Sequence, residues 1–358
     1  MRARSRLPSD SIGIHLKKLL KRIRHRSRVY LGFAFHYVSL LRYQQRERRI
    51  DPTVQFIAVI LIEHMGDIVA CEPVFRHLRK MHPSAKIIWI GRSEYRELVD
   101  RNPSVDFVLP VHCLTEKEYL KSRCRFEQIY DLHFRDRTCA MCGPGINRPP
   151  STDTPGNEIT LKNFYSFGNI LQSMSRHSGL PSLNDKPAVY IPDSARSRVD
   201  QLHLPADFVV FHCSSNTPEK EWPKERWIEL AKTVHSVHGC RVVEVGLDAT
   251  FDAASNPSMV PAAGQLSILE TAEVIRRARL FVGIDSGPAH LANAVGSYGI
   301  VLLGSYLGFK RYNPFSGDFG EGKTATLIHA EGFVAAISVA EVAESVNAAL
   351  NRKTGSVE

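Results

Sequence analysis

Long apolar runs and a secretory signal are both missing from this 358-residue sequence. No apolar segment reaches the roughly 18–20 residues that a membrane-spanning helix needs. The best candidate, Val29 to Leu41, is too short and contains His36. The Arg-rich start lacks a compact apolar core followed by a small-residue cleavage site, so we expect a cytoplasmic protein.

Two motifs of cofactor- and metal-dependent enzymes are also absent. The first strand-to-helix turn carries no G-x-G-x-x-G, which argues against a dinucleotide-dependent dehydrogenase. No Asp-x-Asp pair occurs, which argues against the glycosyltransferases that hold a divalent ion on the donor diphosphate. Gly317–Thr324 matches the phosphate-binding loop G-x-x-x-x-G-K-[ST], but no buried strand precedes it and no helix follows, so it is expected to be a surface turn. The sequence predicts no cofactor and no catalytic metal.

The seven cysteines are an odd number, and without a secretory signal reduced thiols are expected. Cys139-Ala-Met-Cys142 matches the C-x-x-C pattern, but no second pair lies at the spacing of a zinc site. Cys113 and Cys124 are the other thiols that could join it. We favour buried or incidental thiols over a metal site, although the pattern leaves the metal site open.

Acidic residues are scarce only at the N-terminus. Residues 1–50 hold 14 Lys and Arg residues but only 2 acidic residues, which gives a net charge of +12. The remaining residues hold 32 Lys and Arg residues and 35 acidic residues, which gives a net charge of −3. The basic character therefore belongs to an N-terminal arm. Because the body is mildly acidic, the sequence predicts no nucleic-acid partner.

Helical spacing of apolar residues is present in this arm, over Ile12 to Arg49. Leu16, Leu20 and Ile23 alternate with Lys and Arg, and an aromatic segment around Phe35 follows. We expect one or two basic amphipathic helices at an anionic membrane surface, on the inner face of the cytoplasmic membrane. The alternative is an arm that docks on its own domain or on a partner.

The body alternates strands with helices, which predicts an α/β protein with parallel sheets. Pro181–Pro192 resembles a linker, after which the alternation restarts. We expect two Rossmann-like domains facing a cleft, at 51–190 and 191–358, after the arm at 1–50. The predicted strands are Val54–Ile62, Lys86–Gly91, Phe107–Val111, Gln128–Leu132, Phe208–His212, Cys240–Gly246, Leu280–Ile284, Gly299–Gly304 and Ala325–His329.

Three turns that follow predicted strands carry candidate functional residues. Open α/β sheets bind ligands at the carboxyl ends of their strands. Asp67 in the first turn is a candidate general base, although it could equally be a helix N-cap. The second turn carries Ser214, Ser215 and Lys220, and the third is Asp285-Ser286-Gly287-Pro288-Ala289-His290. Hydroxyls, a lysine and free N–H groups at a helix start are groups that surround a phosphate.

These motifs, taken in order, resemble the ADP-heptose–lipopolysaccharide heptosyltransferases. The resemblance rests on Met65-Gly66-Asp67, on His212-Cys-Ser-Ser with Lys220-x-Trp222-Pro223, and on Asp285-Ser-Gly-Pro-x-His290. It implies the GT-B fold and inverting, metal-independent transfer from a nucleotide sugar, ADP-heptose above all, to a lipid-linked or oligosaccharide acceptor. Another nucleotide sugar, or a catalytically silent nucleotide-sugar-binding protein, remains an alternative.

The resemblance also implies a role for each motif residue. Asp67 would be the catalytic base, while Ser214, Ser215 and Lys220 would hold the diphosphate. Asp285 would contact donor-sugar hydroxyls, and Ser286, Gly287 and His290 would lie near the phosphates. Three features depart from the family pattern: the basic arm is additional, Glu72 is unusual in the turn after Asp67, and Lys220 lies one residue further from the serine pair than in some members.

Overall fold

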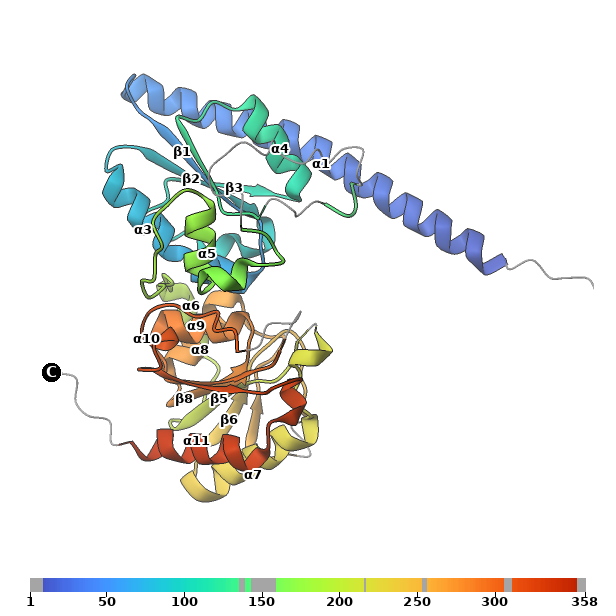
Figure 1. Cartoon of the computed structure of the whole chain (residues 1–358), viewed down its shortest axis with the longest axis vertical. Helices are drawn as coiled ribbons and strands as arrows, with labels where there is room; N and C mark the ends of the chain where they lie inside the picture. The colour runs from blue at the N-terminus through green and yellow to red at the C-terminus, as the bar shows by residue number, and fades with distance from the viewer. Residues whose placement is uncertain are drawn as a thin grey trace, which may run out of the picture.

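Two parallel β-sheets form the body of the protein (Figure 1). The computed structural model describes residues 9–134, 139–142, 159–215, 217–252, 256–305 and 311–352, with side chains from residue 16 onward. The predicted loop at 143–157 lies outside the described residues. The alternating pattern predicted parallel sheets in two Rossmann-like units, and the structure has two such sheets.

The N-terminal sheet has the strand order β3-β2-β1-β4. Its strands are β1 (Phe56–Leu61), β2 (Lys86–Arg92), β3 (Phe107–Val111) and β4 (Gln128–Asp131). The C-terminal sheet has the order β10-β9-β8-β5-β6-β7. Its strands are β5 (Phe208–His212), β6 (Arg241–Glu244), β7 (Met259–Pro261), β8 (Leu280–Ile284), β9 (Gly299–Leu303) and β10 (Ala325–His329).

Two predicted helices are divided in the structure. The predicted helix after the first turn is α2 (Met65–Ala70) followed by α3 (Glu72–Met81). The one predicted from Leu161 to Arg176 is a 3-10 helix, η2 (Phe164–Phe167), followed by α5 (Ile170–His177). The other helices are α4 (Leu114–Arg123), α6 (Asp193–Asp200), α7 (Lys224–His238), α8 (Ile268–Arg277), α9 (Gly287–Val295), α10 (Gly317–Gly320) and α11 (Val339–Asn351), with 3-10 helices η1 (Ser93–Leu98), η3 (Pro218–Lys220) and η5 (Val334–Ala336).

Every residue of β1 is buried, as a parallel strand covered on both faces requires. Side chains alternate between the two faces of a strand. Ile57 and Val59 belong to the core formed with α2 and α3, whereas Phe56 and Ile60 belong to a separate core that contains Leu40 of α1 (Ser9–Ile50). Helix α1 therefore supplies part of the layer that covers the second face of the N-terminal sheet.

The arm is a single helix, α1, and its second half docks on its own domain. Leu40 is fully buried and Tyr43 is 8% exposed, and the Tyr43 ring stacks on Phe107 at 4.3 Å between centroids. His36 Nδ1 lies 2.5 Å from the buried carboxylate of Glu116 on α4. This half therefore matches the alternative that the arm docks on its own domain.

The first half of α1 extends beyond the sheet (Figure 1). Leu16, Leu20 and Ile23 are each more than half exposed, and Leu31 is 72% exposed. Among the described helices, none is long and apolar enough to cross a membrane.

Glu72, the departure from the family pattern, anchors the linker to the N-terminal domain. Its buried carboxylate accepts hydrogen bonds from the Tyr190 hydroxyl at 2.9 Å and the Ala188 N–H at 3.0 Å. Arg76, one turn along α3, pairs with the same carboxylate at 3.0 Å. A second link joins the domains directly, because Glu97 accepts the N–H of Ile268 at the start of α8 at 3.0 Å.

The contrast between Leu40 and Leu31 makes the docking of α1 testable. Leu40→Ala should lower the free energy of unfolding by about 2–5 kcal/mol, since it leaves a cavity between α1 and the sheet. Leu31→Ala removes the same atoms from the exposed face of the same helix and should change it by about 0.5 kcal/mol or less. Urea unfolding followed by circular dichroism measures both. Equal effects would show that α1 does not pack as described.

Candidate active site

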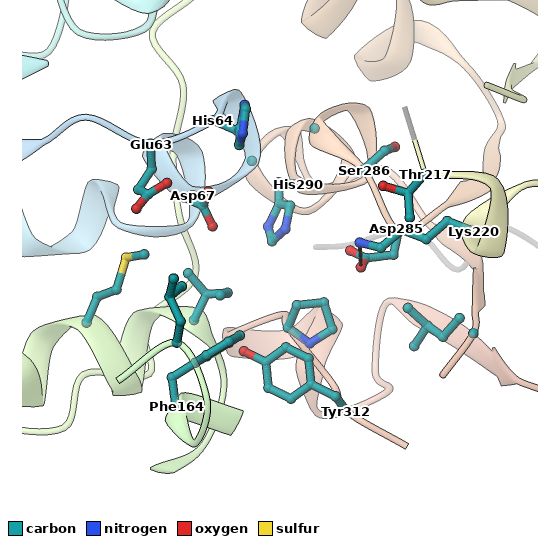
Figure 2. A pocket seen from close by; sticks show the side chains of 18 of the residues that line it. Glu63, His64, Asp67, Phe164, Thr217, Lys220, Asp285, Ser286, His290 and Tyr312 are labelled. Atoms are coloured by element: carbon teal, nitrogen blue, oxygen red, sulfur yellow. Dashed lines mark hydrogen bonds and ion pairs between the residues drawn. The ribbon is translucent and has the colours of Figure 1, made fainter. Parts of the chain in front are cut away.

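A cavity of about 480 Å³ lies between the domains, at the carboxyl ends of strands from both sheets (Figure 2). The N-terminal domain contributes residues after β1, including Asp67, and the C-terminal domain contributes residues after β5 and β8. The structure brings Asp67, Lys220, Asp285, Ser286, Gly287 and His290 together in its lining.

Asp67 is half-buried in the first turn of α2, and its carboxylate points toward the cavity (Figure 2). The N-cap of this helix is His64, whose side chain makes no capping hydrogen bond. The alternative that Asp67 is the N-cap is therefore wrong. Its position inside the helix fixes the backbone behind the carboxylate, which suits a group that must be held against a substrate.

The glycines of two motifs allow α2 and α9 to touch across the cleft. A Cβ atom on Gly66 would lie 2.8 Å from the His290 ring, and one on Gly287 would lie 2.0 Å from the Met65 side chain. Such distances are too short for real contacts, so a side chain at Gly66 would displace the His290 ring, and one at Gly287 would require the flexible end of Met65 to move. Glycine serves here for close approach rather than for an unusual backbone angle. The start of each helix thus lies against the other domain.

The opposite wall carries an ion pair between Lys220 and Asp285. Lys220 Nζ lies 2.6 Å from Asp285 Oδ2, and both side chains are 22% exposed (Figure 2). The lysine comes from η3 and the aspartate from the end of β8, so the pair joins two of the predicted motifs. Its atoms remain open to the cavity, where an anionic ligand can reach the ammonium group.

The serine pair, which the resemblance assigns to the diphosphate, lies outside this lining. Among the described lining residues neither Ser214 nor Ser215 occurs, whereas Thr217 does. Ser215 Oγ instead accepts the N–H of Thr217 at 3.1 Å and so shapes the turn that presents Thr217. Sequence reasoning missed Thr217. Its position between the serine pair and Lys220, as a third hydroxyl residue in the same turn, could have pointed to it.

His290 is 5% exposed and faces the cavity from α9 (Figure 2). Burial lowers its pKa to about 4, an effect that the negative charge of Asp285 opposes. The imidazole is therefore neutral at physiological pH. Within the described part of the chain, its Nδ1 atom has no hydrogen-bond partner, which leaves it able to bond a ligand.

Aromatic rings form a wall that the motifs did not predict. Phe164 and Tyr312 meet edge to face, 5.5 Å apart between centroids (Figure 2). Burial, together with the charges of Asp285 and Asp67, raises the pKa of Tyr312, so its phenol stays protonated. No spacing in the sequence links Phe164 to Tyr312, because they come from segments of different domains. Their contact could therefore not be predicted from a motif.

Glu63 lines the N-terminal side of the cavity and is 1% exposed. Its Oε1 atom lies 3.3 Å from His133 Nε2. Sequence reasoning placed Glu63 in the first turn, directly after the predicted strand Val54–Ile62, but gave it no role.

Comparisons with known proteins find a matching family model and a similar curated protein. Residues 171–306 match the family model glycosyltransferase family 9 (heptosyltransferase). The chain is 22% identical over 274 residues to lipopolysaccharide heptosyltransferase 3 of Escherichia coli, covering 67% of this chain and 81% of that protein. The predicted resemblance to the heptosyltransferases and the assignment as a glycosyltransferase are confirmed.

Solved structures establish the fold independently. A glycosyltransferase family 9 protein from Veillonella parvula superposes with a TM-score of 0.63 at 18% identity, covering 84% of this chain and 98% of that one. The ADP-heptose lipopolysaccharide heptosyltransferase II of E. coli gives a TM-score of 0.60 at 20% identity, with 83% and 98% covered.

The lowered pKa of His290 predicts a pH dependence of stability. Below pH 6.5 the unfolded chain binds a proton at this residue, but the native protein does so only near pH 4. The free energy of unfolding should therefore fall as the pH decreases through this window, by up to about 3 kcal/mol from this residue.

His290→Asn removes that contribution, so its stability difference from the wild type should shrink as the pH is lowered from 7 to 4.5. Urea unfolding at several pH values measures it. His203→Asn is the matched control, since His203 is exposed and its left-handed backbone, at φ 48°, also suits Asn. A pH-independent difference for His290→Asn would contradict the buried neutral imidazole.

Proposed function

We propose that this heptosyltransferase-like glycosyltransferase moves a heptose from ADP-heptose to a lipopolysaccharide core or other glycan acceptor, with inversion and without a metal ion. The observation that supports this most is that Asp67 and the Lys220–Asp285 pair line one cavity from opposite domains. A base on one side and a cation on the other suit a displacement in which the acceptor enters opposite the leaving group.

In this mechanism Asp67 accepts the proton of the acceptor hydroxyl as its oxygen bonds to the anomeric carbon. The bond from that carbon to the diphosphate breaks, and the pair of electrons leaves with the diphosphate. Lys220 balances the charge that grows there. The start of α9 lies beside this charge, and its backbone N–H groups favour anions. It carries Ser286, Gly287 and the neutral His290.

In this mechanism Lys220 changes its ion-pair partner when the donor binds. Without donor, the charge of Lys220 is balanced by Asp285 at 2.6 Å. A bound diphosphate pairs with Lys220 in place of Asp285. The carboxylate of Asp285 then becomes available to the hydroxyls of the donor sugar. Thr217, at the same wall, adds a hydroxyl donor.

Asp67→Asn tests the role of the base. The amide keeps the size of the side chain but cannot accept the proton, so the turnover number should fall by roughly 10²–10⁴-fold. Donor affinity, measured by calorimetry, should hardly change. Asp193→Asn, at an exposed site on α6, is the control and should be fully active. An active Asp67→Asn variant would refute the assignment.

Lys220→Ala tests the stabilisation of the leaving group. It should lower both turnover and the affinity for nucleoside diphosphate, because the lysine meets charge in the bound and the transition state. Lys232→Ala, an exposed lysine of α7, should leave both unchanged. Wild-type affinity in Lys220→Ala would show that the lysine does not contact the diphosphate.

The absence of a metal from the reaction is tested with the wild type. The rate should be the same with Mg²⁺ or Mn²⁺ added and with EDTA added just before the assay. Complete loss of activity on immediate EDTA addition would contradict the mechanism.

The same proposal places the enzyme at the inner face of the cytoplasmic membrane, where a lipid-linked acceptor would lie. On α1, the exposed apolar residues Leu16, Leu20, Ile23 and Leu31 recur at helical spacing, away from the docked face that holds Leu40. Exposed basic residues lie between them, namely Lys17, Lys18, Lys21 and Arg22. Each basic group near an anionic surface contributes about 1 kcal/mol, and apolar insertion adds to it.

Vesicle co-sedimentation tests this without removing the docked half of α1. The full chain should bind anionic vesicles, bind less in high salt and hardly bind neutral ones. Replacing both Leu20 and Ile23 by Asp should reduce binding at least tenfold. Leu247→Asp, at an 85% exposed apolar site of the C-terminal domain, should bind like the wild type. Equal loss in both variants would refute a specific role for α1.

A further inference from the structure

Four metal-ligating side chains from three separate segments meet outside the catalytic cavity. His25 comes from α1, Cys113 directly precedes α4, and Cys139 and Cys142 follow β4. The ligand atoms of these four residues all lie within 4.8 Å of one another. Cys113 and Cys142 are buried, and the other two are half-buried.

Two distances in the cluster are close to those of a tetrahedral site. A zinc ion binds sulfur at about 2.3 Å and histidine nitrogen at about 2.0–2.1 Å, which places neighbouring ligand atoms of a tetrahedron about 3.5–3.8 Å apart. Cys113 Sγ and Cys142 Sγ are 3.9 Å apart, and Cys139 Sγ and His25 Nε2 are 3.4 Å apart. These two pairs share no residue, so they correspond to opposite edges of one tetrahedron.

The backbone around the cluster has the form of a ligand loop. The Cys142 N–H donates to the Cys139 carbonyl at 3.2 Å, which closes the C-x-x-C turn. Arg26, next to His25 on α1, donates from its guanidinium to the Cys142 carbonyl at 2.7 Å. Three thiolates and a neutral imidazole around a divalent ion carry a net charge of −1, and the guanidinium lies where it offsets that charge.

A disulfide does not explain the cluster. Its sulfur atoms would have to lie about 2.0 Å apart, roughly half the distance between Cys113 and Cys142. Apolar packing explains it only in part: Val29 and Tyr119 adjoin the cluster, but they do not account for an imidazole directed at a thiol. Cys124, which the sequence offered as a partner of the C-x-x-C pair, lies in a different core.

We propose that His25, Cys113, Cys139 and Cys142 bind one zinc ion. On binding, the three thiols release three protons, and the imidazole binds through its unprotonated Nε2. With four protein ligands no position stays open for water or substrate, so the role is structural. The ion ties the first half of α1 to α4 and to the segment after β4, beyond the point where Leu40 and Tyr43 hold the helix.

Metal content is the primary test. The full chain, purified under reducing conditions without a metal-affinity tag, should contain one zinc per chain by plasma mass spectrometry. Cys139→Ser and Cys142→Ser should each lose at least 80% of it. Cys124→Ser replaces a buried cysteine of the same domain outside the cluster and should keep it. A chain without zinc after supply of Zn²⁺, one iron in its place, or equal loss in Cys124→Ser would overturn the proposal.

A second measurement begins with the unaltered chain, so its first part does not depend on the folding of a variant. Replacing zinc by Co²⁺ in the full chain should give the intense visible bands of tetrahedral cobalt with thiolate charge transfer near the ultraviolet. His25→Ala should weaken Co²⁺ binding about tenfold or more, since even supporting residues around a metal contribute about that much. It should also speed limited proteolysis within residues 16–28. An octahedral Co²⁺ spectrum, or unchanged binding in His25→Ala, would rule out the four-ligand site.

Discussion

The contact between the starts of α2 and α9 sets the width of the cavity between the domains. A Cβ on Gly66 would lie too close to the His290 ring, and one on Gly287 would force the Met65 side chain to move. The contact holds Asp67 on one wall against Lys220 and Asp285 on the other. The hydrogen bond from Ile268 of α8 to Glu97 of η1 reinforces it, and so does the bond from Tyr190 of the linker to Glu72 of α3. The proposed chemistry depends on this spacing, because neither domain alone carries both a base and a phosphate-binding cation.

A parallel sheet buried on both faces explains why the basic arm cannot be a free appendage. Phe56 and Ile60 point to a face that Leu40 and Tyr43 of α1 help to cover. The same helix presents apolar and basic side chains to solvent where it extends past the sheet. One element therefore completes the core of the N-terminal domain and, in the proposed function, orients that domain on a membrane. The proposed zinc ion lies between these two parts of the helix.

The sequence predicted those features that local patterns encode. Strands such as Phe208–His212 and Leu280–Ile284 have the predicted bounds, because continuous buried apolar runs have few alternatives. Asp67 and Asp285 follow strands, and the rule that ligands bind at carboxyl ends placed them correctly at the cavity. What depends on pairing between distant segments was not predictable. Tyr312 and Phe164 meet only in the folded chain, and the partner of the C-x-x-C pair is His25, more than a hundred residues away. The sequence did not show that one face of α1 docks on the protein, because the same helical spacing of apolar residues suits a protein core and a membrane surface.

The most direct test of the account is a panel of nucleotide sugars offered to the purified full chain with a glycan acceptor, with release of nucleoside diphosphate measured over time. The account predicts release of ADP from ADP-heptose, dependent on the acceptor, well above the rate with UDP- or GDP-sugars. Turnover of a different nucleotide sugar would contradict the donor assignment while keeping the fold and reaction class. Binding of nucleotide sugars without turnover of any, in the presence of acceptor, would contradict the central claim that Asp67 and Lys220 form one catalytic site.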